Sequence, residues 1–114
     1  MKKNFLIYFC LIIFPFIFLF PYTFNIIGLG NDFNILYYDF KVYLLDKLNS
    51  GDFPLWSPSE AAGFPFYSNP FSQIFYPLNI ILYFFYKIFG RWSAFDHQIF
   101  TIFDISIFVI GLYK

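Results

Sequence analysis

The sequence predicts an all-α integral membrane protein with about three transmembrane helices, an amphipathic interfacial helix and a long outer loop rich in proline and aromatic residues. Two observations support this fold class. Sixty per cent of the 114 residues are hydrophobic and 12% are charged, a balance that a small water-soluble domain has too little core to hide. The apolar residues are also gathered into runs on both sides of a segment that holds most of the acidic residues.

The composition also argues against a nucleic-acid partner and against cysteine-based disulfide or metal sites. The formal net charge is zero, and a nucleic-acid partner needs a basic face that displaces counterions from phosphates. Cys10 is the one cysteine and lies inside the first apolar run, so the chain has neither a disulfide framework nor a thiolate metal site. We therefore expect the lipid bilayer, and no nucleic acid, as a partner.

The first apolar run, residues 5–27, predicts a membrane-spanning helix. It follows Lys2 and Lys3, as in a signal peptide, but small residues suited to cleavage do not follow it, which favours an uncleaved anchor. Its roughly twenty residues are enough to cross the hydrocarbon core. Pro15 and Pro21 are the expected kink points.

Residues 76–89 and 95–113 predict a second and a third span, the second of them short. Lys87 near the end of the second run and Arg91 in the turn after it are the basic residues between the two spans. Basic residues close to membrane spans stay in the cytoplasm. The N-terminus and this turn are therefore expected on the cytoplasmic side, and the acidic loop 31–79 on the outer side.

Inside the outer loop, the spacing of apolar residues predicts a helix over about 33–48. The stripe on one face comprises Phe33, Tyr37, Phe40, Leu44 and Leu48, at spacings that bring them together on a helix. Asn49, Ser50 and Gly51 end this helix. Three aspartates, Asp32, Asp39 and Asp46, recur every seven residues and share a face away from the stripe, which predicts a row of carboxylates exposed to water.

The segment from Asp52 to Pro77 predicts an ordered coil. Its prolines, at positions 54, 58, 65, 70 and 77, interrupt helices and central strands. Long irregular segments that remain rich in aromatic residues are more often binding loops than linkers. Gly63 is expected to provide a turn with positive φ.

The ordered set of loop motifs resembles a known family. The motifs are Asn31-Asp32, the helix around Tyr37-Tyr38, Gly51-Asp52-Phe53-Pro54-Leu55-Trp56-Ser57-Pro58, Gly63-Phe64-Pro65, Asn69-Pro70 and Phe75-Tyr76-Pro77-Leu78-Asn79. Together they look like the amino-terminal part of YfhO-type bacterial membrane proteins, which are related to the glycosyltransferase class C fold. The resemblance covers residues 5–114 as the opening portion of a larger polytopic protein, which would be inactive as this portion alone.

The resemblance implies an enzyme of the bacterial cytoplasmic membrane that moves a sugar from a polyprenyl-phosphate donor to an extracytoplasmic cell-envelope acceptor. It also implies a catalytic carboxylate just after the first span. By position this residue is Asp32, with Asp39 in reserve. A carboxylate suits this chemistry because the attacking hydroxyl needs a base or an oriented hydrogen-bond acceptor.

Other interpretations of these carboxylates stay open. Asp32 is equally suited to cap the helix that follows it, and Asp39 and Asp46 to a solvated face. The cofactor is undetermined, although a divalent cation held by the carboxylate row is a further hypothesis. An alternative function is a small three-span protein without enzymatic activity that acts as an interaction or assembly partner.

Three polar residues fall in the third apolar run. Asp96 and His97 are expected at the N-terminus of its helix. Asp104 lies near the middle, where a charge implies a partner, a water-filled cavity or protonation.

Overall fold

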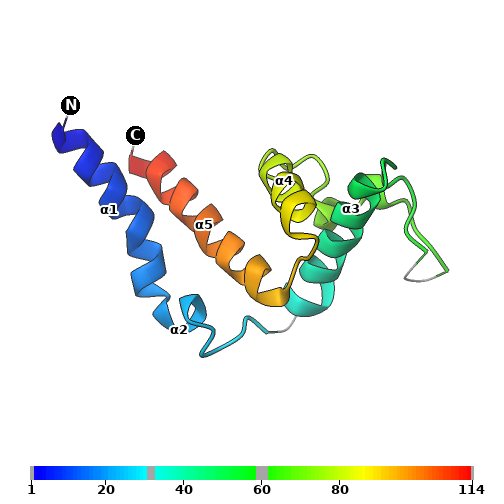
Figure 1. Cartoon of the computed structure of the whole chain (residues 1–114), viewed down its shortest axis with the longest axis horizontal. Coiled ribbons are helices and arrows are strands. Elements are labelled where there is room, and N and C mark those ends of the chain that lie inside the picture. Colours follow the sequence, from blue (N-terminus) through cyan, green and yellow to red (C-terminus); the bar gives the residue numbers. More distant parts are fainter. Residues whose placement is uncertain (1, 31–32, 59–61, 114) are drawn as a thin grey trace. The chain divides into compact units, whose positions relative to one another are not determined.

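The computed structural model describes residues 2–30, 33–58 and 62–113, and within these ranges the regular structure is helical. The elements in chain order are α1 (Lys2–Phe18), α2 (Phe20–Thr23), the π-helix η1 (Phe33–Tyr38), α3 (Asp39–Asn49), the 3₁₀ turns η2 (Phe66–Ser68) and η3 (Pro70–Ser72), α4 (Asn79–Phe89) and α5 (Ala94–Tyr113) (Figure 1). This confirms the predicted all-α class. The chain divides into two compact units, Met1–Leu29 with Ser93–Lys114, and Gly30–Trp92.

In the described part of the chain, one helix is long and apolar enough to cross a membrane. This helix is α5, with 20 residues. At a rise of 1.5 Å per residue it is about 30 Å long, which matches the hydrocarbon core. The apolar helices α1 and α4 are shorter, with 17 and 11 residues. The structure therefore supports membrane association through α5, and it does not establish three spans.

The first unit is built on α1 and α5, which lie side by side and run antiparallel (Figure 1). The Ser106 hydroxyl donates to the carbonyl oxygen of Ile12 at 3.0 Å. Nearer the chain ends, the rings of Tyr8 and Tyr113 meet edge to face with centroids 6.0 Å apart. Because contacts nearer the start of α1 involve residues nearer the end of α5, the pair forms an antiparallel hairpin.

Proline accounts for the break that follows α1. The helix continues through Pro15 and ends at Phe18, and α2 begins at Phe20 with Pro21 in its first turn. Pro21 has no N–H to donate to the carbonyl oxygen of Ile17, and in a continuous helix its ring would clash with that carbonyl. Thr23 then folds back, and its hydroxyl donates to the carbonyl oxygen of Phe16 at 2.8 Å. This bond satisfies a carbonyl group near the end of α1.

Gln98 fixes the chain that leaves α2. Its side chain is buried, and its amide group donates to the carbonyl oxygens of Tyr22 at 2.5 Å and Ile27 at 3.3 Å. Its amide oxygen accepts from the Leu29 N–H at 2.9 Å. A single buried side chain therefore satisfies three backbone groups, one at the end of α2 and two in the irregular segment that follows it.

The second unit has an aromatic and aliphatic core around α3. Phe40 and Leu44 of the predicted stripe are buried together with Phe66 from the loop. The ring of Phe66 contacts Phe40 at 5.6 Å and Tyr43 at 4.9 Å, between centroids. The predicted helix is thus confirmed as η1 followed by α3. Its end is confirmed as well, since Ser50 caps α3 and Gly51 has a φ of +79°.

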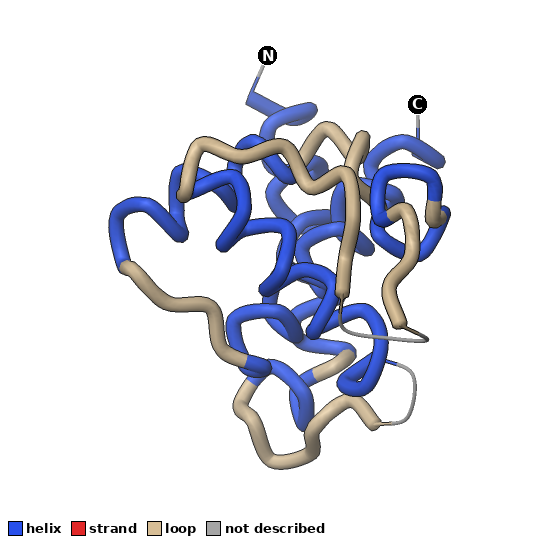
Figure 2. The backbone as a smooth tube through the Cα atoms, turned by 90° about the vertical axis from the view of Figure 1, so that its right-hand side faces the viewer, coloured by secondary structure: helices blue, strands red, loops and turns tan. Residues whose placement is uncertain are grey.

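The predicted coil after α3 is also confirmed over residues 52–58 and 62–77, which are the part of it that the structure describes. Figure 2 shows the helices of this unit joined by long loops, and residues 62–77 contain only the short turns η2 and η3. Ser57 and Phe64 pair through two backbone hydrogen bonds of 2.9 Å. The Tyr43 hydroxyl donates to the Trp56 carbonyl oxygen at 2.5 Å. The first contact closes the proline-rich segment on itself, and the second attaches it to α3.

Gly63 occupies a position that other residues fit poorly. Its φ is +104°, and a Cβ added there would overlap the indole ring of Trp56. The expected positive φ is therefore confirmed, and close packing against Trp56 is a second reason for glycine.

We predict that Gly63→Ala destabilises the second unit by about 2 kcal/mol, because the left-handed backbone and the overlap with Trp56 both raise the free energy of the folded state. Gly51→Ala is the matched control. Gly51 has a φ of +79° with no atom within 4 Å of the added Cβ, so it reports the backbone cost alone, about 1 kcal/mol. Denaturant unfolding in micelles, followed by tryptophan fluorescence, measures both. Equal losses in the two variants would contradict the packing role of Trp56.

Candidate functional site

The reserve candidate Asp39 lies at the junction of η1 and α3 and is exposed to solvent. Asp32, the first candidate, lies outside the described residues. The junction is held by Tyr38, whose hydroxyl donates to the carbonyl oxygen of Trp92 at 3.0 Å. A π-helix has wider turns than an α-helix, and such turns are frequent at functional sites. Asp39 therefore offers an accessible carboxylate on a fixed helix start.

Asp46 is exposed, as predicted, but it is engaged by another helix. The hydroxyl of Tyr86 on α4 donates a hydrogen bond to the carboxylate of Asp46 on α3. This hydrogen bond raises the pKa of the Tyr86 phenol above its ordinary value of 10.0, and burial and the negative charge of Asp46 act in the same direction. Each effect favours the neutral phenol over the phenolate. Asp46 thus connects α3 to α4, a role that makes it a weaker catalytic candidate than Asp39.

The described carboxylates of α3 do not fit a shared cation. Asp39 and Asp46 are separated by seven residues, which places them about 10 Å apart along the helix axis. A calcium ion needs oxygen ligands at about 2.3–2.6 Å. No three His, Cys, Asp or Glu side chains gather in the described ranges. The cation hypothesis therefore gains no support from Asp39 and Asp46 as a pair.

A buried lysine is the polar feature that the sequence pattern did not identify. Lys41 is 2% exposed, and its ammonium group donates to the amide oxygens of Asn79 at 2.7 Å and Gln73 at 3.5 Å. Asn79 in turn donates to the backbone carbonyl oxygens of Gln73 at 2.6 Å and Ile74 at 3.3 Å. This cluster fastens α3 to the first residue of α4. The sequence holds one indication that Lys41 is buried. Lys41 lies one helical turn before Leu45, so the two side chains share a face of the helix, and Leu45 is buried.

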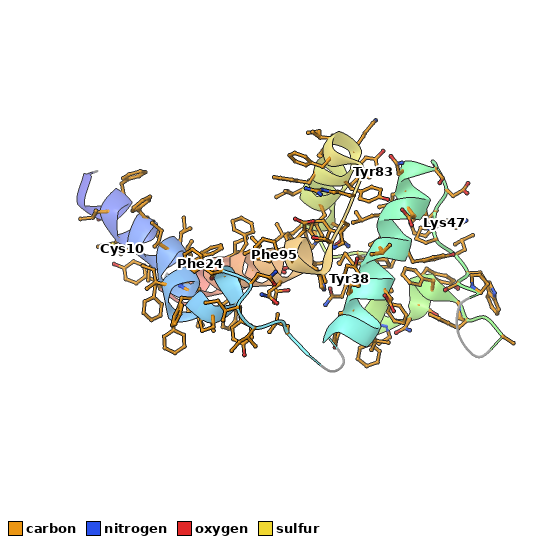
Figure 3. All side chains as sticks on the ribbon, turned by 60° about the horizontal axis from the view of Figure 1, so that its bottom comes forward. Cys10, Phe24, Tyr38, Lys47, Tyr83 and Phe95 are labelled. Atoms are coloured by element: carbon orange, nitrogen blue, oxygen red, sulfur yellow. The ribbon has the colours of Figure 1, made fainter. Side chains whose placement is uncertain are left out.

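An open groove of about 630 Å³ lies beside this cluster. Its lining comes from Leu48 on α3, the turn 51–53, the segment 74–77, and Asn79, Ile80, Tyr83 and Phe84 on α4. Figure 3 labels Tyr83 on α4 and Lys47 on α3. The lining is mostly apolar, with Asp52 as its carboxylate. Asp39 is not among the lining residues, so the groove and the candidate catalytic carboxylate are separate features of the unit.

In the first unit, the expected N-terminal position of Asp96 is confirmed. The Asp96 carboxylate accepts from the Ser93 backbone N–H at 2.9 Å and from the Ser93 hydroxyl at 2.6 Å. The Asp96 N–H donates back to that hydroxyl at 3.1 Å, which completes a reciprocal cap. His97 is buried one residue later, and Asp104 is partly buried within α5.

We predict that Asn79→Leu destabilises the protein by about 2–3 kcal/mol, because it removes an acceptor from a buried ammonium group and the donor to two backbone carbonyls. Asn49→Leu is the control, since Asn49 is exposed at the end of α3 and surface changes stay within about 0.5 kcal/mol. Denaturant unfolding measures both free energies. A loss below 0.5 kcal/mol for Asn79→Leu would contradict the role of the cluster.

We also predict that Tyr86 titrates above the ordinary tyrosine pKa of 10.0 in the folded protein. Because the folded pKa is raised, its contribution to stability is fully present below 10.0 and is lost as the pH rises through the folded value. The difference in tyrosinate absorbance between wild type and Tyr86→Phe isolates this group. Asp46→Asn should lower the pKa of Tyr86. Asp39→Asn removes the same charge elsewhere on α3 and should leave the pKa of Tyr86 unchanged. Equal shifts would exclude the direct bond.

Comparison of the chain with protein-family models, curated proteins and solved structures found no match. The resemblance of the loop motifs to YfhO-type proteins therefore stays a prediction. The candidate function rests on the exposed carboxylates of the Gly30–Trp92 unit and on the apolar helices before and after it.

Proposed function

We propose that this chain forms the amino-terminal part of a membrane glycosyltransferase. In this proposal a sugar passes from a polyprenyl-phosphate donor to an extracytoplasmic acceptor of the cell envelope. The observation that carries the proposal is the order of the elements: an apolar helix, a folded unit with an exposed carboxylate at a helix start, and a second apolar helix. That order supports a proposed location of the carboxylates near a membrane surface, where lipid-linked donors are found.

The chemistry assigned to the carboxylate is that of a base. The acceptor hydroxyl gives its proton to the carboxylate, and its oxygen forms a bond to the anomeric carbon of the sugar. The bond from that carbon to the phosphate oxygen breaks, and its electron pair leaves with the polyprenyl phosphate. We assign this role to Asp32, with Asp39 as the second candidate. Positioned carboxylates of this kind contribute roughly 10²–10⁴-fold to rate.

The proposed location is the bacterial cytoplasmic membrane, with the N-terminus in the cytoplasm. We propose two crossings, α1 with α2 and then α5. A third crossing by 76–89 would have to use α4, whose 11 residues extend about 16 Å, roughly half the hydrocarbon thickness. Two crossings place the whole Gly30–Trp92 unit on the outer side, including Lys87 and Arg91. Lys87 and Arg91 lie close to the start of α5 and oppose this orientation, whereas Lys2 and Lys3 before the first crossing favour it.

The alternative is a small membrane protein that acts as an interaction or assembly partner. The exposed apolar side chains of the Gly30–Trp92 unit, such as Phe75 at 76% exposure, favour contact with another surface. This alternative requires no catalytic carboxylate.

We predict that Asp32→Asn, made in the complete reading frame that encodes these residues, lowers sugar transfer at least about 100-fold. The measurement is incorporation of labelled sugar from a polyprenyl-phosphate donor by isolated membranes that contain equal amounts of each variant. Asp39→Asn tests the second candidate in the same assay.

Asp46→Asn is the matched control, because it removes the same charge from the face of α3 that carries Asp39 and is expected to change transfer little. Full activity in both Asp32→Asn and Asp39→Asn would remove the catalytic assignment. Absence of transfer with every donor by the unmodified protein would favour the interaction partner.

A further inference from the structure

We propose that α4 lies flat in the membrane interface, with its outward face buried in lipid. This inference rests on the proposed membrane location of the chain. The outward face is built from two rows at i, i+4 and i+8, which comprise Ile80, Phe84 and Ile88 in one row and Ile81, Phe85 and Phe89 in the other. Their exposed fractions range from 43% to 76%. Ile80 and Phe84 border the open groove and remain more than half exposed. Such a continuous apolar helix face is unusual on a protein surface bathed in water.

The opposite face of α4 is held against the protein, so the helix cannot rotate its apolar side inward. Asn79 and Leu82 are buried. Asn79 accepts from Lys41 at 2.7 Å, and Tyr86 donates to Asp46. These contacts lie on one side of the helix, because residues three and four apart share a face. The outward direction of the two apolar rows is therefore fixed by polar contacts with α3.

The chemistry around the apolar face suits a lipid surface. The Lys87 ammonium lies 5.9 Å from the centroid of the Tyr83 ring, at the flank of the face, and Arg91 follows the end of the helix. Basic side chains at the rim of an apolar face pair with anionic headgroups, and tyrosine prefers the same depth. The chain also continues into apolar helices on both sides of the Gly30–Trp92 unit. A bilayer is thus within reach of α4 at both ends of its unit.

The length of α4 favours a position along the surface over a crossing. Pro77 precedes its first turn, and Gly90 ends it with a φ of +65°. A left-handed glycine is a common helix stop. The resulting length of about 16 Å leaves a crossing helix with backbone groups in hydrocarbon beyond both ends, where each unsatisfied group is costly.

Spin labels at Ile80, Phe84 and Ile88 test this inference in the full chain. Each residue is changed to cysteine in a Cys10→Ser background, and the protein is reconstituted in phosphatidylcholine vesicles containing phosphatidylglycerol. Collision with oxygen and with a water-soluble nickel chelate gives the depth of each label. We expect all three labels to be accessible to oxygen at one shallow depth. A crossing helix would instead spread them over about 12 Å, because eight residues separate the first from the last.

Labels at Ile105, Phe108 and Leu112, which are exposed on α5, are the control and should become shallower toward Leu112. If these labels contact only the nickel chelate, the membrane location itself fails. If they behave as expected, three results at α4 overturn the inference alone: a graded depth, which means a crossing; contact with nickel only, which means water; or contact with neither reagent, which means that a second copy or another protein covers the face.

Discussion

The apolar surface of this chain is the constraint on which the rest of the structure depends. This 114-residue chain leaves many of its large hydrophobic side chains outside a protein core. Phe5, Ile17 and Phe108 are each about two-thirds exposed or more, at 72%, 68% and 65%. In the proposed membrane location, lipid removes these apolar side chains from water without requiring a protein core. The polar contacts of the chain then determine which faces turn away from lipid.

Much of the fold follows from local sequence. Phe40 and Leu44 of the predicted stripe have the helical period and are buried, and Leu48 packs against them. Gly51 and the prolines that follow end the helix, because they supply backbone geometries that helices exclude. Composition located the apolar run 76–89 but not its helical length. Pro77 and Gly90 set the bounds of α4, and they shorten an expected span to an 11-residue helix.

Less of the candidate site could be predicted from the sequence. From the sequence alone, Lys41 is expected to be a charged side chain exposed to water. In the structure it is buried and donates to Asn79, which is 38 residues away. The contact of Asp46 with Tyr86 spans 40 residues. Such pairings depend on how α3 packs against α4, and periodicity along one helix carries no information about a partner helix. Asp39 was predicted on an exposed face and lies on one, since exposure, unlike pairing, follows from the helical period.

Sidedness tests the central claim most directly, because the proposed chemistry needs the Gly30–Trp92 unit outside the cytoplasm. Ser50 and Asn4 are both exposed, and each can be changed to cysteine after Cys10→Ser. A membrane-impermeant maleimide applied to cells should label the cysteine at position 50 directly and the one at position 4 only after the membrane is opened. Labelling at position 50 that also requires an opened membrane would contradict the account.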